Sequence, residues 1–159
     1  MIVSVSERIS RLQNRLLDRL RHRDAFAVSN EVPIVGDFSD FRGARQCLLI
    51  TFKRSGEPVP SPVNFGLSDD GTLFARCEPN VAKVRRIRND PRVHVCPCSF
   101  RGKPLGPLVR ATARIVPESG VQRAHRILAA NWDPLSRVFE RAVDLVHTPV
   151  VYIEISPSA

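Results

Sequence analysis

The middle of this 159-residue chain alternates short apolar stretches with turn-forming clusters, and this alternation limits the fold more than any other feature. The stretches are rich in β-branched residues and too short for typical helices. Gly, Pro, Asp and Ser separate them, most clearly at residues 68–71, where Ser-Asp-Asp-Gly favours a tight turn. The pattern predicts five consecutive strands, over Gln46–Lys53, Val59–Leu67, Thr72–Cys77, Arg92–Cys98 and Leu108–Val116.

Helical patterns flank and interrupt these strands, and residues 26–45 look irregular. The other predicted elements are a helix over Ser4–Arg23 with a Ser4–Glu7 capping box, a helix over Val81–Asn89 capped by Asn80, a helix over Val121–Ala130, a helix that starts at Asp133 and Pro134, and a strand over Val150–Ile155. About six strands with one crossover helix indicate a small barrel, of the mainly β with α (α+β) class, and not a parallel βαβ sheet.

We expect a single domain over residues 1–159. Residues 1–40 form an N-terminal helix and lead-in, residues 41–116 the barrel core, and residues 117–159 helices and the last strand. The longest apolar runs, such as residues 47–50, are too short to span a bilayer, and residues 2–24 are Arg-rich and lack an apolar signal core. The expected location is cytoplasmic, with no membrane partner.

The four cysteines predict no disulfide or redox motif, because none of their spacings is CxxC. They are interpreted as buried, reduced thiols, with a zinc site at Cys96-Pro97-Cys98 as the alternative. The four histidines are scattered, and no acid lies at a recognisable catalytic spacing from them. The sequence therefore predicts neither a catalytic residue nor a metal ligand.

The formal net charge of +8 implies an anionic partner, which is a nucleic acid, an anionic lipid or a phosphorylated ligand. One Trp and one Tyr leave few aromatic rings for base stacking, so nucleic acid ranks last. No GxGxxG or P-loop motif occurs. Instead, Lys83 falls in the first turn of a basic helix, where its ammonium and free backbone N–H groups can converge on one phosphate. The alternative is a solvated basic face.

Prolines alternate along the second predicted strand, at positions 58, 60 and 62. Proline cannot donate to a β-ladder, so these residues predict an irregular edge whose backbone could face a flat ring. The alternative is an edge protected from aggregation.

Several segments occur together in a familiar order: Arg42–Arg45, Leu48–Phe52, Gly56–Val63, Lys83–Val93, Pro97–Cys98 and Arg101–Pro107. With them, residues 41–116 resemble the pyridoxamine 5'-phosphate oxidase-like split β-barrel family. The resemblance is closest to its actinobacterial branch of PPOX-class, coenzyme F420-dependent oxidoreductases. It implies a homodimer with cofactor sites at the subunit interface, and coenzyme F420, or alternatively FMN, as cofactor.

The resemblance also assigns roles to residues. Lys83 is expected to grip the cofactor phosphate, Arg86 and Arg88 to assist with phosphate or a polyglutamate tail, and Thr51 to contact phosphate or ribityl. The complete set of expected contacts is Thr51, Pro60, Ser61, Pro62, Val63, Asn64, Lys83, Arg86 and, contributed to the site of the other subunit, Cys98. Asn64 departs from the aromatic residue, usually Trp, that relatives often carry there. This departure bears on which cofactor binds.

The expected reaction is hydride transfer from reduced coenzyme F420 to a small unsaturated or conjugated acceptor, with the chemistry supplied by the cofactor. Two alternatives share the fold. One is an FMN-binding oxidoreductase, and the other is a non-catalytic protein that binds flavin, deazaflavin or haem.

Overall fold

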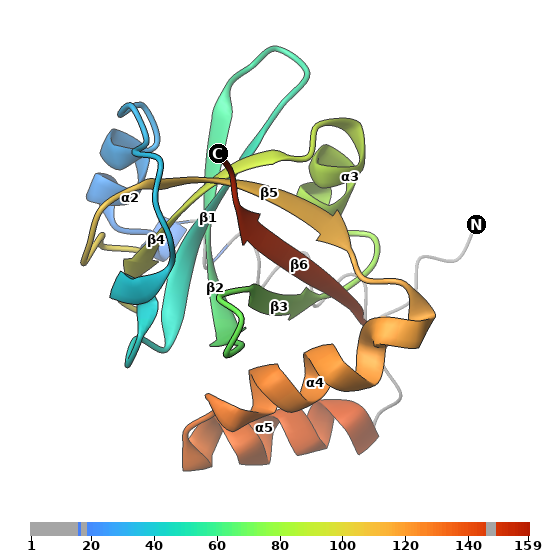
Figure 1. Cartoon of the computed structure of the whole chain (residues 1–159). Helices are drawn as coiled ribbons and strands as arrows, with labels where there is room; N and C mark the ends of the chain where they lie inside the picture. Colours follow the sequence, from blue (N-terminus) through green and yellow to red (C-terminus); the bar gives the residue numbers. More distant parts are fainter. Residues whose placement is uncertain (1–15, 17–18, 146–148) are drawn as a thin grey trace.

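Antiparallel strands form a closed barrel in the computed structural model, which describes residues 16, 19–145 and 149–159 (Figure 1). The strands are β1 (Gln46–Phe52), β2 (Pro58–Leu67), β3 (Leu73–Cys77), β4 (Arg92–Cys98), β5 (Val109–Ile115) and β6 (Val151–Pro157). They are hydrogen-bonded in the order β1-β2-β3-β6-β5-β4. All six predicted strands are confirmed, each to within two residues at either end. The predicted class, a six-stranded split barrel with added helices, is confirmed with them.

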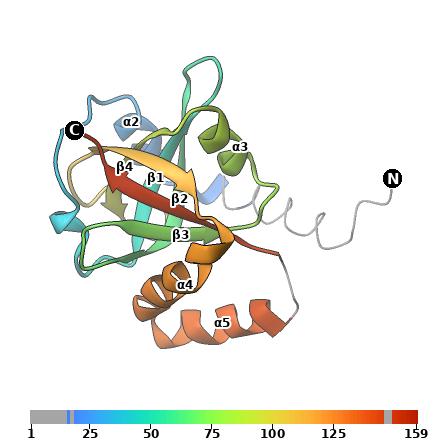
Figure 2. The ribbon, with the colours of Figure 1, turned by 45° about the vertical axis from the view of Figure 1, so that its right-hand side comes forward.

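Four α-helices and two short 3-10 helices complete the described chain. They are α2 (Arg23–Val28), η1 (Ser39–Phe41), α3 (Ala82–Asn89), η2 (Glu118–Gly120), α4 (Val121–Ala130) and α5 (Pro134–Leu145). Helix α3 crosses from β3 to β4, as predicted, while α4 and α5 lie together on one outer side of the barrel (Figures 1 and 2). Among the described residues, no helix has both the length and the apolar content to cross a membrane.

The prediction of an irregular segment over residues 26–45 is wrong in part, because α2 and η1 occupy some of it. Helix α2 starts where His22 caps it, since the His22 Nδ1 accepts a hydrogen bond from the Asp24 backbone N–H at 3.2 Å. Arg23 is therefore the first residue of α2, whereas the sequence pattern predicts it as the last residue of the helix over Ser4–Arg23. Most of the helix predicted over Ser4–Arg23, including its capping box, lies outside the described residues.

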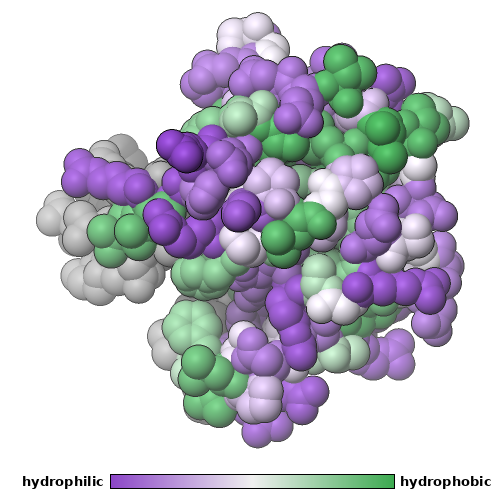
Figure 3. Space-filling model, turned by 90° about the vertical axis from the view of Figure 1, so that its left-hand side faces the viewer, coloured by the Kyte–Doolittle hydropathy of each residue, from purple (hydrophilic) through white to green (hydrophobic). Residues whose placement is uncertain are grey.

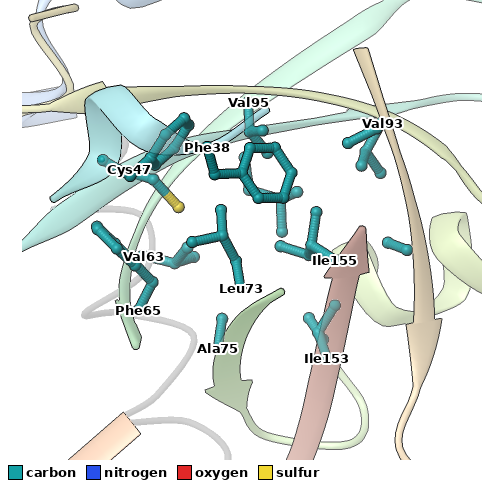
Figure 4. Packing of buried hydrophobic residues seen from close by; sticks show 14 of the residues in the cluster. Phe38, Cys47, Val63, Phe65, Leu73, Ala75, Val93, Val95, Ile153 and Ile155 are labelled. Atoms are coloured by element: carbon teal, nitrogen blue, oxygen red, sulfur yellow. The ribbon is translucent and has the colours of Figure 1, made fainter. Parts of the chain in front are cut away.

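The barrel interior is filled by alternate residues of the strands, as the two-residue period of a β-strand requires (Figure 4). Phe38 and Phe41 close one end, where their rings meet edge to face at 5.1 Å between centroids. Both are 1% exposed, as is Phe65, whose ring Phe41 contacts at 5.7 Å. The aromatic residues around η1 thus belong to the core, and this fixes the path of the lead-in segment.

Two further apolar clusters lie outside the barrel. Helix α2 covers the outer face of β1, where Ala25 packs with Leu48 and Ile50. Helix α4 covers the other side, packing against β3 and β6. At Gly66 the strand and helix backbones approach so closely that a Cβ atom would lie 2.3 Å from the Ile127 carbonyl oxygen. Only glycine permits this contact.

Candidate functional site

The pairing of β1 with β2 divides the predicted cofactor contacts between the two faces of the sheet. Thr51 opposes Val59, Leu49 opposes Ser61 and Cys47 opposes Val63, and Cys47, Leu49 and Val63 belong to the barrel interior. Because residues paired across strands share a face, Thr51, Ser61 and Val63 point inward. The outward set is Pro60, Pro62, Asn64 and Cys98. The predicted contacts on the strands are therefore divided between the two faces of the sheet.

Helix α3 brings a basic group to the inward-facing end of β1. Arg86 donates from Nη1 to the Thr51 hydroxyl oxygen at 3.0 Å, although the two residues are 35 positions apart. Thr51 is fully buried, and Arg86 is partly buried. The structure thus joins two of the predicted contacts in one hydrogen bond.

The start of α3 lacks a capping side chain, so the prediction that Asn80 caps it is wrong. The N-cap residue is Val81, which has no oxygen in its side chain, and the first turn carries no acid. The Asn80 carbonyl instead accepts a hydrogen bond from Arg85 Nη1 at 2.9 Å. The backbone N–H groups of the first turn are thus left without a side-chain acceptor, beside Lys83. The positive charge of Lys83 and the uncapped backbone N–H groups therefore lie at the same helix end, where they can bind an anion.

The charge of Lys83 acts on two cysteine thiols of the barrel. Burial raises the pKa of Cys47 and of Cys77, and the ammonium of Lys83 acts on both thiols in the opposite direction. Within α3, Val84 and Ile87 are buried against the barrel, whereas Arg85 and Arg88 are exposed.

The proline-containing half of β2 is an open edge. Residues 58–64 pair with β1 on one side, and β3 joins β2 only from Phe65 onward, so no described strand pairs with the other side of residues 58–64. The predicted edge is confirmed, but the strand is continuous over ten residues and not irregular. Because proline has no N–H, positions 58, 60 and 62 must be those that face away from β1. Their carbonyl oxygens line an edge with no donors.

The outward contacts lie in a different environment. Cys98 is 3% exposed beneath α2, and burial raises its pKa to about 12. Asn64 accepts a hydrogen bond from Gln46 Nε2 at 3.1 Å, so the residue that departs from the family pattern is tied to the neighbouring strand. Pro62 lies beside Gly102, where an added Cβ would approach its ring at 3.0 Å. These residues do not reach the Arg86–Thr51 end of the site.

The structure also shows features that sequence reasoning missed. A pocket of about 360 Å³ has a lining that includes Phe41, Arg42, Phe65, Asp69, Ile127 and Asn131. These residues come from three distant segments, so no local motif signals the pocket. We place the anion-binding end at the start of α3 and not here, because Lys83 lies there beside backbone N–H groups that no side chain caps.

Two histidines have partners that the sequence interpretation did not foresee. His125 Nδ1 lies 2.7 Å from the Tyr152 hydroxyl, and His22 Nδ1 lies 3.4 Å from a carboxylate oxygen of Asp24. Burial lowers the pKa of His94, which favours its neutral form. Among the described residues, no cluster of three or more His, Cys, Asp or Glu side chains could hold a metal ion.

A family profile described as Pyridoxamine 5'-phosphate oxidase matches residues 37–148. No curated protein is similar at a significant level.

Several solved structures share the fold at low sequence identity. A protein of unknown function from Agrobacterium tumefaciens is 20% identical with a TM-score of 0.55, covering 73% of this chain and 49% of its own. This chain thus spans about half of that protein. The heme storage protein HutZ from Vibrio cholerae is 15% identical with a TM-score of 0.55, covering 77% and 88%. An FAD-binding protein from Mesorhizobium loti is 20% identical with a TM-score of 0.50, covering 72% and 80%.

Proposed function

The chain belongs to the pyridoxamine 5'-phosphate oxidase family, and on this basis we propose that it is a flavin- or deazaflavin-dependent oxidoreductase. The preferred cofactor is coenzyme F420, with FMN as the alternative. When bound, the reduced deazaflavin supplies the hydride that a small unsaturated or conjugated acceptor receives. The FAD-binding protein of similar fold supports a flavin-type ligand.

The observation that carries this proposal is the anion-binding character of the start of α3. The helix has no acidic residue, its first turn has no side-chain cap, and Lys83 and Arg86 lie on the side next to the barrel. A phosphate placed there would accept from backbone N–H groups and from charged donors. Such charge-assisted bonds are roughly twice as strong as neutral ones. The residues present therefore fit a phosphorylated cofactor.

The open edge of β2 fits the ring of such a cofactor. The carbonyl oxygens of Pro58, Pro60 and Pro62 face this edge, where they can accept hydrogen bonds from a ring N–H. With no donor on the same edge, another strand cannot pair there in a regular ladder. The prolines thus keep the edge open for a flat ligand, while Thr51 and Arg86 hold the phosphate end.

Charge favours the deazaflavin over FMN. Coenzyme F420 carries a glutamate tail in addition to its phosphate, and α3 offers two exposed guanidinium groups, on Arg85 and Arg88, beyond the phosphate contacts. The net charge of +8 also favours coenzyme F420, the more negatively charged of the two cofactors. The free thiols fit the reducing cytoplasm in which we place this activity.

We further propose that the chain is a homodimer with cofactor sites at the interface. Large apolar side chains are exposed on the side of the molecule that carries α2, namely Phe26, Val32, Ile34, Val35, Phe100 and Leu105. Hydrogen bonds place their segments together, from His22 N to the Arg101 carbonyl at 2.7 Å and from Ile34 N to the Leu108 carbonyl at 2.8 Å. Figure 3 shows hydrophobic side chains among hydrophilic ones on this side. Exposed apolar groups that gather in this way favour association.

Ligand titration tests the cofactor assignment. Coenzyme F420 and FMN are titrated into the protein and into a Lys83→Ala variant, with ligand fluorescence as the signal. Arg126→Ala serves as a control, because Arg126 is an exposed basic residue on α4, outside the proposed interface. We expect micromolar binding that weakens at least tenfold in Lys83→Ala and not in the control.

Each alternative gives a different result in this titration. Tighter binding of FMN than of coenzyme F420 would select the FMN-dependent oxidoreductase. Binding of haem alone, seen as a shift of its Soret band, would indicate a binding protein, as the similarity to HutZ allows. If neither flavin-type ligand binds at micromolar concentration, the proposed function fails. Unchanged binding by Lys83→Ala would refute the phosphate assignment alone.

A further inference from the structure

Helix α5 turns its apolar side chains toward solvent. Leu135, Val138 and Phe139 are 80%, 67% and 66% exposed, and their spacing of three and four places them in one stripe along the helix. Both ribbon views show α5 as the element farthest from the barrel, with α4 between them (Figures 1 and 2). No described element covers the stripe.

The polar side of α5 faces the protein instead. Glu140 forms an ion pair with Arg76 of β3, and the two side chains are only 14% and 8% exposed. The Arg76 guanidinium also lies over the ring of Trp132, 5.2 Å from its centroid. A surface helix of a soluble domain normally buries its apolar stripe and exposes its charges. Helix α5 has the reverse orientation, so its apolar stripe faces away from the barrel and is left for another contact.

The charges beside the stripe indicate the chemistry of that contact. Arg137 and Arg141 are exposed on α5, and in the described part of the chain neither forms an ion pair. Glu140 is the only acid of the helix whose side chain the structure describes, and it is paired with Arg76. A helix with Leu and Phe on one face and exposed arginines on its polar side has the character of an interfacial membrane helix.

We propose that α5 is a surface-attachment helix that binds anionic phospholipid membranes. The helix lies parallel to the membrane, with Leu135, Val138 and Phe139 at the boundary of headgroups and acyl chains. Arg137 and Arg141 contact lipid phosphates, and the Arg76–Glu140 pair holds the helix to the barrel. This proposal goes beyond the proposed cofactor function and does not depend on it.

A second copy of the chain is a poorer occupant of this stripe. The surface area that three large side chains can bury falls well short of the ~800 Å² per partner that a stable interface buries. A two-fold, antiparallel pairing of α5 with itself would also place the arginines of both copies on the same side. The net charge of +8 attracts an anionic surface.

The proposal differs from the expectation of no membrane partner. That expectation rested on the absence of a long apolar run, which excludes a spanning helix. Attachment to a membrane surface needs only one short apolar stripe and nearby positive charge. The orientation of the stripe is visible only in the folded protein.

Vesicle co-sedimentation of the full chain tests the proposal. Vesicles of phosphatidylcholine alone are compared with vesicles that contain phosphatidylglycerol as well. We expect binding to the anionic vesicles only. An Arg137→Gln, Arg141→Gln double variant should bind about 25-fold more weakly, since each arginine near an anionic surface strengthens binding about fivefold. Phe139→Ser should also weaken binding, whereas Leu20→Ser, at an exposed site outside α5 and outside the proposed interface, should not.

Three results would overturn the proposal. The first is no binding of the unaltered chain to anionic vesicles at low salt. The second is equal binding by the α5 variants, which would place any membrane contact on another basic part of the chain. The third is loss of self-association in Phe139→Ser without a change in vesicle binding, which would assign the stripe to a second copy. Coenzyme F420 binding, measured in parallel, reports on the proposed function separately.

Discussion

Gly66→Ala tests whether the close contact between β2 and α4 positions the helices. The added Cβ would lie 2.3 Å from the Ile127 carbonyl oxygen and 2.6 Å from the Leu128 Cα, whereas ordinary contacts lie at 3.4–4 Å. Both neighbours are backbone atoms, so no flexible side chain can move aside. Helix α4 must shift by about 1 Å, which disturbs the packing of Leu128 and Trp132 on the barrel. Overpacking of this kind costs about 1–3 kcal/mol, and the backbone clash places this variant near 3 kcal/mol.

Urea unfolding followed by tryptophan fluorescence measures this change, because Trp132 is the only tryptophan and lies at the end of α4. Gly36→Ala is the matched control. Its Cβ would meet only the Ile34 side chain, at an ordinary 3.7 Å, and its backbone conformation suits alanine. The control should leave stability unchanged or raise it by up to about 1 kcal/mol, since alanine restricts the unfolded chain. A loss below about 0.5 kcal/mol in Gly66→Ala would refute the reasoning.

Two further predictions concern buried ionisable groups. Glu140→Gln should lower the free energy of unfolding by about 1–3 kcal/mol, because it removes the charge that pairs with the nearly buried Arg76, and a urea titration with Arg137→Gln as control measures this. Burial raises the pKa of Cys96 and Cys98 from 9.0 to about 12, so the unfolded chain loses these protons first. Stability should therefore be unaffected by these thiols below pH 9 and should fall as pH rises from about 9 toward 12. The fall should be smaller in a Cys96→Ala, Cys98→Ala double variant, and an equal fall in both proteins would contradict the assignment.

Much of the barrel could be predicted from local signals. Turn clusters such as residues 68–71 and the alternation within each strand locate the strands to within two residues. The errors occurred where long-range contacts decide the local structure. Phe38 and Phe41 lie in a segment with glycine and proline that looks irregular, yet their rings close the barrel and order a 3-10 helix there. Asn80 is a good capping residue by type, but the chain enters α3 one residue later, at Val81.

The candidate site shows the same division. The sequence predicts Lys83 on a basic helix and an unpaired proline edge, since both depend on neighbouring residues. It could not show that Arg86 bonds to Thr51, because that contact depends on how α3 folds back onto β1. It also could not show that Cys98 lies on the opposite face of the sheet from Thr51, which follows from strand register.

The sequence alone therefore determines the succession of strands and helices, the positive charge and the proline edge of β2, because each is encoded by residues close together in the chain. The tertiary structure decides which faces meet. Strand register assigns Thr51 and Cys98 to opposite faces of the sheet. The ion pair between Arg76 and Glu140 lies on the side of α5 that faces the barrel. The amphipathic pattern of a helix shows that it has an apolar face, but only packing against the rest of the chain decides whether that face is buried or left open.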